Sequence, residues 1–104
     1  MPLTGDFKAT IKYRAQHDAA FRVGLLTEAA QCLLSDEVDI AKSLLRDYVN
    51  ATLGFNELAL LIDKKPQSLM RMLSTTGNPS LSNISKLMAS LHHYEGIELQ
   101  VHAQ

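Results

Sequence analysis

The sequence predicts a mainly α-helical domain with five helices between short N- and C-terminal β-strands. Residues 19–95 carry apolar side chains mostly at helical spacing, whereas residues 7–13 and 97–102 alternate strictly between apolar and polar. The chain has 104 residues, of which 46% are hydrophobic, and this suits one domain with a modest core. We therefore expect residues 1–104 to form a single domain.

The two terminal segments are expected to be half-buried strands. Apolar residues occupy every second position of both segments, namely Phe7, Ala9, Ile11 and Tyr13 in the first and Ile97, Leu99 and Val101 in the second. A period of two residues places alternate side chains on opposite faces of a strand. The simplest arrangement pairs the two strands, within one subunit or between two, and the sequence favours neither.

Two long helices should follow the first strand. Asp18 is the expected N-cap of a helix over residues 19–34, because its carboxylate can accept a bond from an early backbone N–H. Gly24 in this helix costs about 1 kcal/mol relative to alanine, and either local flexibility or close packing could explain it. Three carboxylates between residues 36 and 39 favour the start of the next helix. Gly54 is its expected terminator.

Three shorter helices complete the domain. Asn56 is expected to cap a helix that ends at residue 62, and Pro66 to begin another that ends at residue 73, because proline suits a first helical position. A loop of small and polar residues follows. Ser80 is the expected N-cap of the last helix, which should end at Gly96.

Residues 56–73 have the spacing of a helix-turn-helix. Several polar side chains would lie on the outward face of its second helix. Arg71 could bond guanine O6 and N7, Gln67 could bond adenine N6 and N7, and Ser68 could bond a base or a phosphate. From spacing alone, the alternative is an ordinary helical hairpin within a bundle.

The charge near this segment is positive, although the whole chain has a net charge of −1. Between residues 64 and 94 there is no acidic residue, and the cations there are Lys64, Lys65, Arg71 and Lys86. DNA contact requires a basic face rather than a basic protein. Lys64 and Lys65, directly before the second helix, are suited to phosphate; an ordinary solvated surface is the alternative.

Short motifs recur in order along residues 55–91: ELA at 57–59, SLMRML at 68–73 and GNPSLSNI at 77–84. This combination resembles the lambda-repressor-like (Xre-type) helix-turn-helix domain. More closely, it resembles the probable addiction-module antidote family, the antitoxins of the HigA type. The resemblance continues upstream through LLRDYVNATLGF and FKATIKYRAQHDAAF, so it covers nearly the whole chain.

The resemblance implies a dimeric repressor that binds double-stranded DNA, controls its own operon and neutralises a toxin, usually a ribonuclease of the RelE superfamily. Two recognition helices in successive major grooves imply a palindromic operator. The recognition-helix positions fall on Pro66, Gln67, Ser68, Met70 and Arg71. The flanking phosphate-contact positions fall on Lys64, Lys65, Thr75, Asn78 and Ser82.

Three positions depart from the family pattern. Asp63 stands where the turn often has glycine, Lys65 where the N-cap is often serine, and Met70 is apolar on the outward face. Two alternatives therefore stand beside the antitoxin: a stand-alone Xre-type transcriptional regulator, and a protein-interaction module whose helix-turn-helix does not read DNA.

Other functional classes lack supporting motifs. The single cysteine, Cys32, excludes an internal disulfide and is expected to be buried. The four histidines lack metal-ligand spacing, and His92 and His93 are expected to complement the dipole of the last helix. No phosphate loop or nucleophile motif is present, so we expect no enzyme activity, metal or cofactor. Without a signal-peptide pattern or a long apolar run, we expect a cytoplasmic protein that does not enter a membrane.

Overall fold

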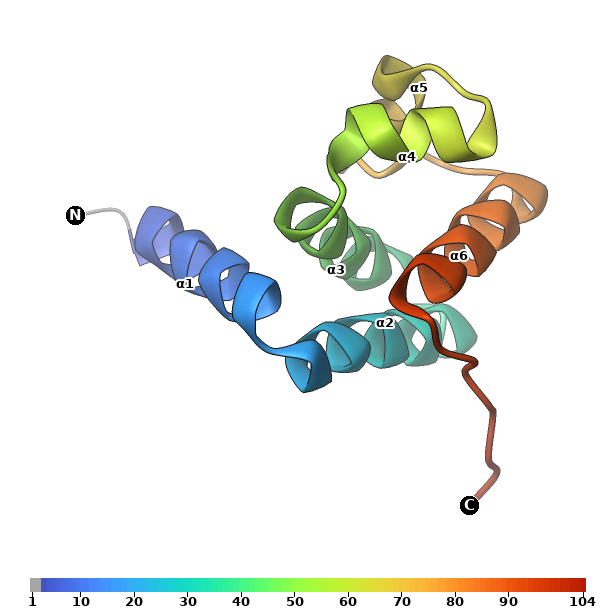
Figure 1. Ribbon diagram of the computed structural model, residues 1–104. Coiled ribbons are helices and arrows are strands. Elements are labelled where there is room, and N and C mark those ends of the chain that lie inside the picture. The colour runs from blue at the N-terminus through green and yellow to red at the C-terminus, as the bar shows by residue number, and fades with distance from the viewer. Residues whose placement is uncertain (1–2) are drawn as a thin grey trace.

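The computed structural model describes residues 3–104, with side chains from residue 7 onward (Figure 1). This part of the chain forms helices and no strand, which confirms the mainly α-helical class. The helices are α1 (Leu3–His17), α2 (Ala19–Leu34), α3 (Val38–Ala51), α4 (Gly54–Ile62), α5 (Pro66–Met72) and α6 (Leu81–Glu95). None of them is both long and apolar enough to cross a membrane.

The hydrophobic core lies around α3, which packs against α1, α2 and α4. In Figure 1, α4 and α5 lie at one end of the molecule, and α6 returns to pack against α2 and α4. Side chains from all six helices of the described chain fill the core. The largest fully buried ones are Tyr48, Leu26, Leu45, Leu58, Leu69, Leu73, Leu87, Leu91 and Val49.

A polar cluster joins α2, α3 and the end of α6. Arg22 donates from Nε and Nη2 to the two carboxylate oxygens of Glu95, at 2.9 and 3.3 Å, and the Tyr48 hydroxyl donates to Glu95 Oε1 at 2.7 Å. Burial would raise the pKa of the Glu95 carboxyl, but the hydrogen bonds from Arg22 and Tyr48 hold that pKa below its ordinary value. Arg22 Nη1 also donates to the Ala15 carbonyl at 3.0 Å, so α1 is tied to the same cluster.

The predicted N-terminal strand is wrong, because residues 7–13 belong to α1. Their alternation also contains a helical pattern: Ile11 and Ala15 are four residues apart, and Ala15 is fully buried. The rings of Tyr13 and His17, again four residues apart, stack with their centroids 4.2 Å apart. Among the four apolar residues of 7–13 only Ile11 is partly buried, so the alternation does not correspond to one buried face.

The predicted C-terminal strand is not formed either. Residues 97–104 leave α6 as a drawn-out segment that runs past α2 (Figure 1). The expected pairing of the two terminal segments as strands, within one subunit or between two, is therefore wrong, since residues 7–13 are helical. The count of five helices was also one short within residues 3–104, because α1 replaces the first strand.

Most helix ends follow the sequence signals. Asp18 accepts a hydrogen bond from Phe21 N at 3.1 Å, Ser80 accepts one from Asn83 N at 3.1 Å, and α6 ends at Gly96 with φ of 75°. The expected Gly54 terminator and the expected Asn56 cap are both wrong, because α3 ends at Ala51 and Gly54 is the first residue of α4, which has no side-chain cap.

Candidate nucleic-acid interface

The turn between α4 and α5 consists of residues 63–65. Asp63 has the left-handed conformation (φ 53°, ψ 53°), and Lys64 N donates to the Ala59 carbonyl at 3.0 Å, which closes the end of α4. A left-handed backbone favours glycine, and aspartate is among the few other residues that adopt it readily. Lys65 follows with extended backbone and no side-chain cap, and α5 begins at Pro66 as predicted.

Helix α5 divides into the two faces that the sequence predicts. Leu69, Met72 and the following Leu73 are buried against the rest of the domain, and this packing fixes the rotation of the helix. The opposite side, called here the recognition face, consists of exposed residues, namely Gln67, Ser68, Met70 and Arg71. Met70 is 47% exposed, so an apolar side chain faces solvent here.

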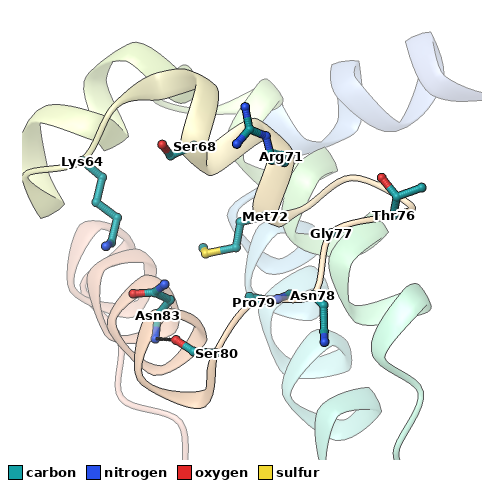
Figure 2. Close-up of a pocket in the computed structure, with 10 residues that line it drawn as sticks. All are labelled: Lys64, Ser68, Arg71, Met72, Thr76, Gly77, Asn78, Pro79, Ser80 and Asn83. Atoms are coloured by element: carbon teal, nitrogen blue, oxygen red, sulfur yellow. Dashed lines mark hydrogen bonds between the residues drawn. The ribbon is translucent and has the colours of Figure 1, made fainter.

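A groove of about 530 Å³ lies beside the recognition face, between α5, the loop at 73–80 and the start of α6. Figure 2 shows Lys64 and Asn83 projecting toward each other from opposite sides of it, with Met72 reaching in from α5. We call this hollow the basic groove. Its lining residues are Lys64, Ser68, Arg71, Met72, Thr76, Gly77, Asn78, Pro79, Ser80 and Asn83.

The charge of the basic groove is positive. Lys64 and Arg71 line it, the exposed Lys65 follows Lys64 in the chain, and its lining contains no carboxylate. The nearest acidic residue in the sequence is the exposed Asp63 in the turn. The remaining lining groups are hydroxyl, amide and backbone groups, which are suited to hydrogen bonds with an anionic, polyoxygenated ligand.

Two cations of α3 hold the far end of α5 and the loop behind it. Lys42 has a side chain only 4% exposed, and its Nζ donates to the carbonyls of Gly77 at 2.7 Å and Thr75 at 3.4 Å. Arg46 Nη1 donates to the carbonyl of Leu73. These bonds use two positive charges within the protein, so Lys42 and Arg46 position the interface and do not add to its outward charge.

Gly77 allows the loop to lie directly on the end of α5. A Cβ atom at this position would lie 2.0 Å from the Arg71 carbonyl oxygen and 2.6 Å from that of Met72. Both atoms belong to the backbone, so a side chain here would push the loop away from the helix. The close approach of Gly77 therefore shapes one wall of the basic groove.

The structure separates the predicted site residues into three groups. The groove is lined by Lys64, Ser68, Arg71 and Asn78. The recognition face adds Gln67 and Met70, with Lys65 and Pro66 at the start of α5. Thr75 and Ser82 are exposed but do not line the groove.

Sequence reasoning missed several residues of the basic groove and its support. Ser80 was predicted only as a helix cap, and Asn83, Thr76 and the supporting Lys42 were not singled out. Lys42 could have been found, because it lies on the apolar stripe of α3 beside Ala41 and a cation there requires internal acceptors. Asn83 and Thr76 depend on how the loop folds, which has no comparable signal.

Two minor predictions have different outcomes. Cys32 is buried, as expected. His92 does not serve as a simple partner of the helix dipole: its Nε2 is buried without a hydrogen-bond partner, and desolvation lowers its pKa, which favours the neutral ring. Among the side chains described, those of residues 7–104, no group of three or more His, Cys, Asp or Glu is arranged to hold a metal ion.

No family model, curated protein or solved structure matches the chain.

Proposed function

We propose that this protein is a sequence-specific DNA-binding transcriptional regulator that inserts α5 into the major groove as a lambda-repressor-like helix-turn-helix. The observation that carries the proposal is the exposed polar face of α5 beside the basic groove. The major groove of B-DNA is about 12 Å wide and admits an α-helix. The buried side of α5 fixes which residues point outward, as base readout requires.

The recognition face offers direct readout of bases. Gln67 and Arg71 are four residues apart and therefore lie on one side of α5, one turn from each other. An arginine bonds guanine in a bidentate manner and a glutamine does the same with adenine. Met70 on the same face supplies an apolar contact suited to a thymine methyl group.

The basic groove is suited to the phosphate backbone beside the bases. Lys64 and Arg71 supply charge, and Asn83 and Ser80 supply polar groups at the start of α6. The N-terminus of this helix, which spans Leu81–Glu95, favours negative charge. Phosphate contacts of this kind would set the register of α5 in the major groove.

The biological role proposed is that of the antitoxin in a type II toxin–antitoxin pair. This step is supported by the sequence motifs of residues 55–91 and their likeness to antitoxins of the HigA type. The protein would act as a dimer on a palindromic operator of its own operon and would bind a toxin of the RelE superfamily. A stand-alone Xre-type regulator is the alternative within the same DNA-binding class.

The DNA-binding proposal is tested by fluorescence anisotropy with duplex DNA from upstream of the protein's own reading frame. At about 100 mM salt, binding should exceed that to a shuffled duplex by about 10³-fold or more. Arg71→Ala should lose most of this preference. Lys12→Ala removes an equal charge from the exposed side of α1, away from α5 in Figure 1, and should not lose it.

A protein-interaction module is the second candidate. It is favoured by two large apolar side chains on α4, Leu60 at 84% exposed and Leu61 at 57% exposed. Copurification with the product of a neighbouring gene, combined with weak DNA binding that ignores sequence, would favour this candidate over a DNA reader.

A further inference from the structure

We infer that the C-terminal segment, residues 97–103, pairs with the same segment of a second copy of this chain as an antiparallel β-ribbon. The segment has the side-chain period of a strand without a neighbouring strand. Ile97 and Leu99 are partly buried against the core, whereas Glu98 and Gln100 are exposed, so burial alternates over residues 97–100; residues 101–104 are all exposed. This interface does not rest on the proposed DNA binding.

The backbone of the segment is open to a partner. Ile97 N donates to the His92 carbonyl at 3.0 Å, and within residues 3–104 no further backbone hydrogen bond involves residues 98–104. An unpaired run of N–H and C=O groups is a template for another strand. The described part of the same chain has no strand to offer, because residues 7–13 are helical.

The side chains make the segment complementary to itself. In an antiparallel pair centred on Gln100, Glu98 lies opposite His102 of the other copy, and this pair occurs twice. On the other face, Leu99 lies opposite Val101, again twice. Each apolar residue therefore meets an apolar one, and each carboxylate meets an imidazole.

Other alignments are less complementary. A parallel pair in register would place Glu98 next to Glu98. An antiparallel pair centred on Leu99 would keep the apolar face but would place Glu98 opposite Gln100, which removes both Glu98–His102 pairs. The matched pairs, apolar with apolar and carboxylate with imidazole, thus favour a second copy in one particular register.

Exposed apolar side chains beside the segment provide further surface that a second copy could bury. Val101 is 79% exposed, and it lines a hollow of about 110 Å³ together with Leu34 of α2, which is 66% exposed. A two-stranded ribbon is marginal alone and gains stability by packing on a helix. Here Leu99 and α2 provide that support.

The first test is the oligomeric state of the full chain without DNA, by light scattering at about 100 µM, where an interface of moderate affinity is populated. The expected result is a dimer that becomes monomeric when residues 98–104 are deleted. A monomeric wild-type protein would overturn the inference, and so would a dimer that survives the deletion. Neither result depends on whether the protein binds DNA.

The register is tested with charges on the exposed face. Glu98→Lys and His102→Glu should each weaken the dimer by about tenfold, and the double variant should restore it to within about threefold, because the pairs are then reversed rather than broken. Both side chains are exposed, so folding should be unaffected. Simple additivity of the two losses would contradict the register.

A covalent test uses symmetry. Gln100→Cys should form an intersubunit disulfide under mild oxidation, because the two copies of residue 100 face each other at the two-fold axis. The wild-type chain is the control, since its only cysteine, Cys32, is buried. Faster crosslinking by Leu99→Cys than by Gln100→Cys would overturn the register centred on residue 100.

Discussion

The Nζ atom of Lys42 lies 2.7 Å from the backbone carbonyl oxygen of Gly77. This bond joins the middle helix of the core to the loop between α5 and α6. The same ammonium group reaches the Thr75 carbonyl at 3.4 Å and Asp39 Oδ1 at 3.4 Å. A buried cation therefore holds one wall of the basic groove against α3.

Replacing Lys42 with methionine should loosen that wall. The methionine keeps the apolar stem but leaves the two loop carbonyls without their charged donor, so we expect a loss of about 1–3 kcal/mol of unfolding free energy. Urea denaturation followed by circular dichroism measures this loss. Lys12→Met, at an exposed position of α1, is the matched control and should change stability by less than about 0.5 kcal/mol. Equal stabilities of the two variants would contradict the role of Lys42.

Gly77 and Gly24 should respond to alanine in opposite directions. At Gly77 the new Cβ would overlap backbone atoms, so Gly77→Ala should destabilise by about 1–3 kcal/mol. At Gly24, inside α2, no atom lies within 4 Å of an added Cβ, so close packing does not explain this glycine. Gly24→Ala should therefore stabilise by about 0.5–1 kcal/mol. Thermal unfolding of both variants tests the pair, and a neutral Gly77→Ala would contradict the close approach.

Lys65 is expected to lower the stability of the fold and to raise the affinity for DNA. It occupies the N-cap position of α5 without a capping bond, so Lys65→Ser should stabilise by about 1 kcal/mol. The same change removes a cation and should reduce the salt dependence of DNA binding by about one phosphate contact. Lys65→Ala removes the charge without adding a cap, so it should show the same loss of DNA binding and no gain in stability. Identical stabilities of the two variants would count against the capping argument.

Stability should fall as the solution is acidified from neutral pH, and His92 should be one cause. Desolvation lowers the pKa of His92 below its ordinary 6.5, so the unfolded chain binds a proton at a pH where the folded chain does not. The contribution of the neutral His92 ring to the free energy of unfolding is therefore fully present above about pH 6.5, and it is lost as the pH falls below that value. The free energy of unfolding can be measured by urea denaturation at about pH 7.5 and at about pH 5.5. His92→Gln should remove the part of its decline between these two pH values that comes from His92.

Glu95 should affect the pH dependence of stability in a separate range, at lower pH than His92. Its folded-state pKa lies below the ordinary 4.5 because Arg22 and Tyr48 donate to the carboxylate. Its contribution is therefore present above about pH 4.5 and is lost as pH falls through the lowered pKa. Glu95→Gln should remove that decline and leave the decline near pH 6 intact. If Glu95→Gln removed the decline near pH 6 instead, the assignment to His92 would be wrong.

The sequence predicted the helices from residue 19 onward well because their signals are local. A capping aspartate, a proline at a first helical position and a terminal glycine act within one turn, and Asp18, Pro66 and Gly96 all lie where these rules place them. The split of α5 into a buried and an exposed face also follows from spacing alone. Each of these predictions needed no knowledge of distant residues.

One failure is local, because α4 begins at Gly54 and not after an Asn56 cap. The others come from features that depend on partners. The alternation in residues 7–13 is typical of a strand, but this segment is helical and α1 packs against α3. A strand at residues 97–102 requires a neighbour that the described chain does not contain. The polar lining supplied by Asn83 and the support from Lys42 depend on a loop path set by Gly77, and no local pattern predicts that path.

The most direct test of the central claim is whether Arg71 reads one base pair. Binding sites would be selected from random duplex DNA with the wild-type protein and again with Arg71→Ala. We predict that the wild type selects a G·C pair at a fixed position, and that Arg71→Ala loses about 1–3 kcal/mol of discrimination there while keeping its preferences elsewhere. A uniform loss of affinity with the same selected sequence, or no selected sequence with either protein, would contradict base readout by α5.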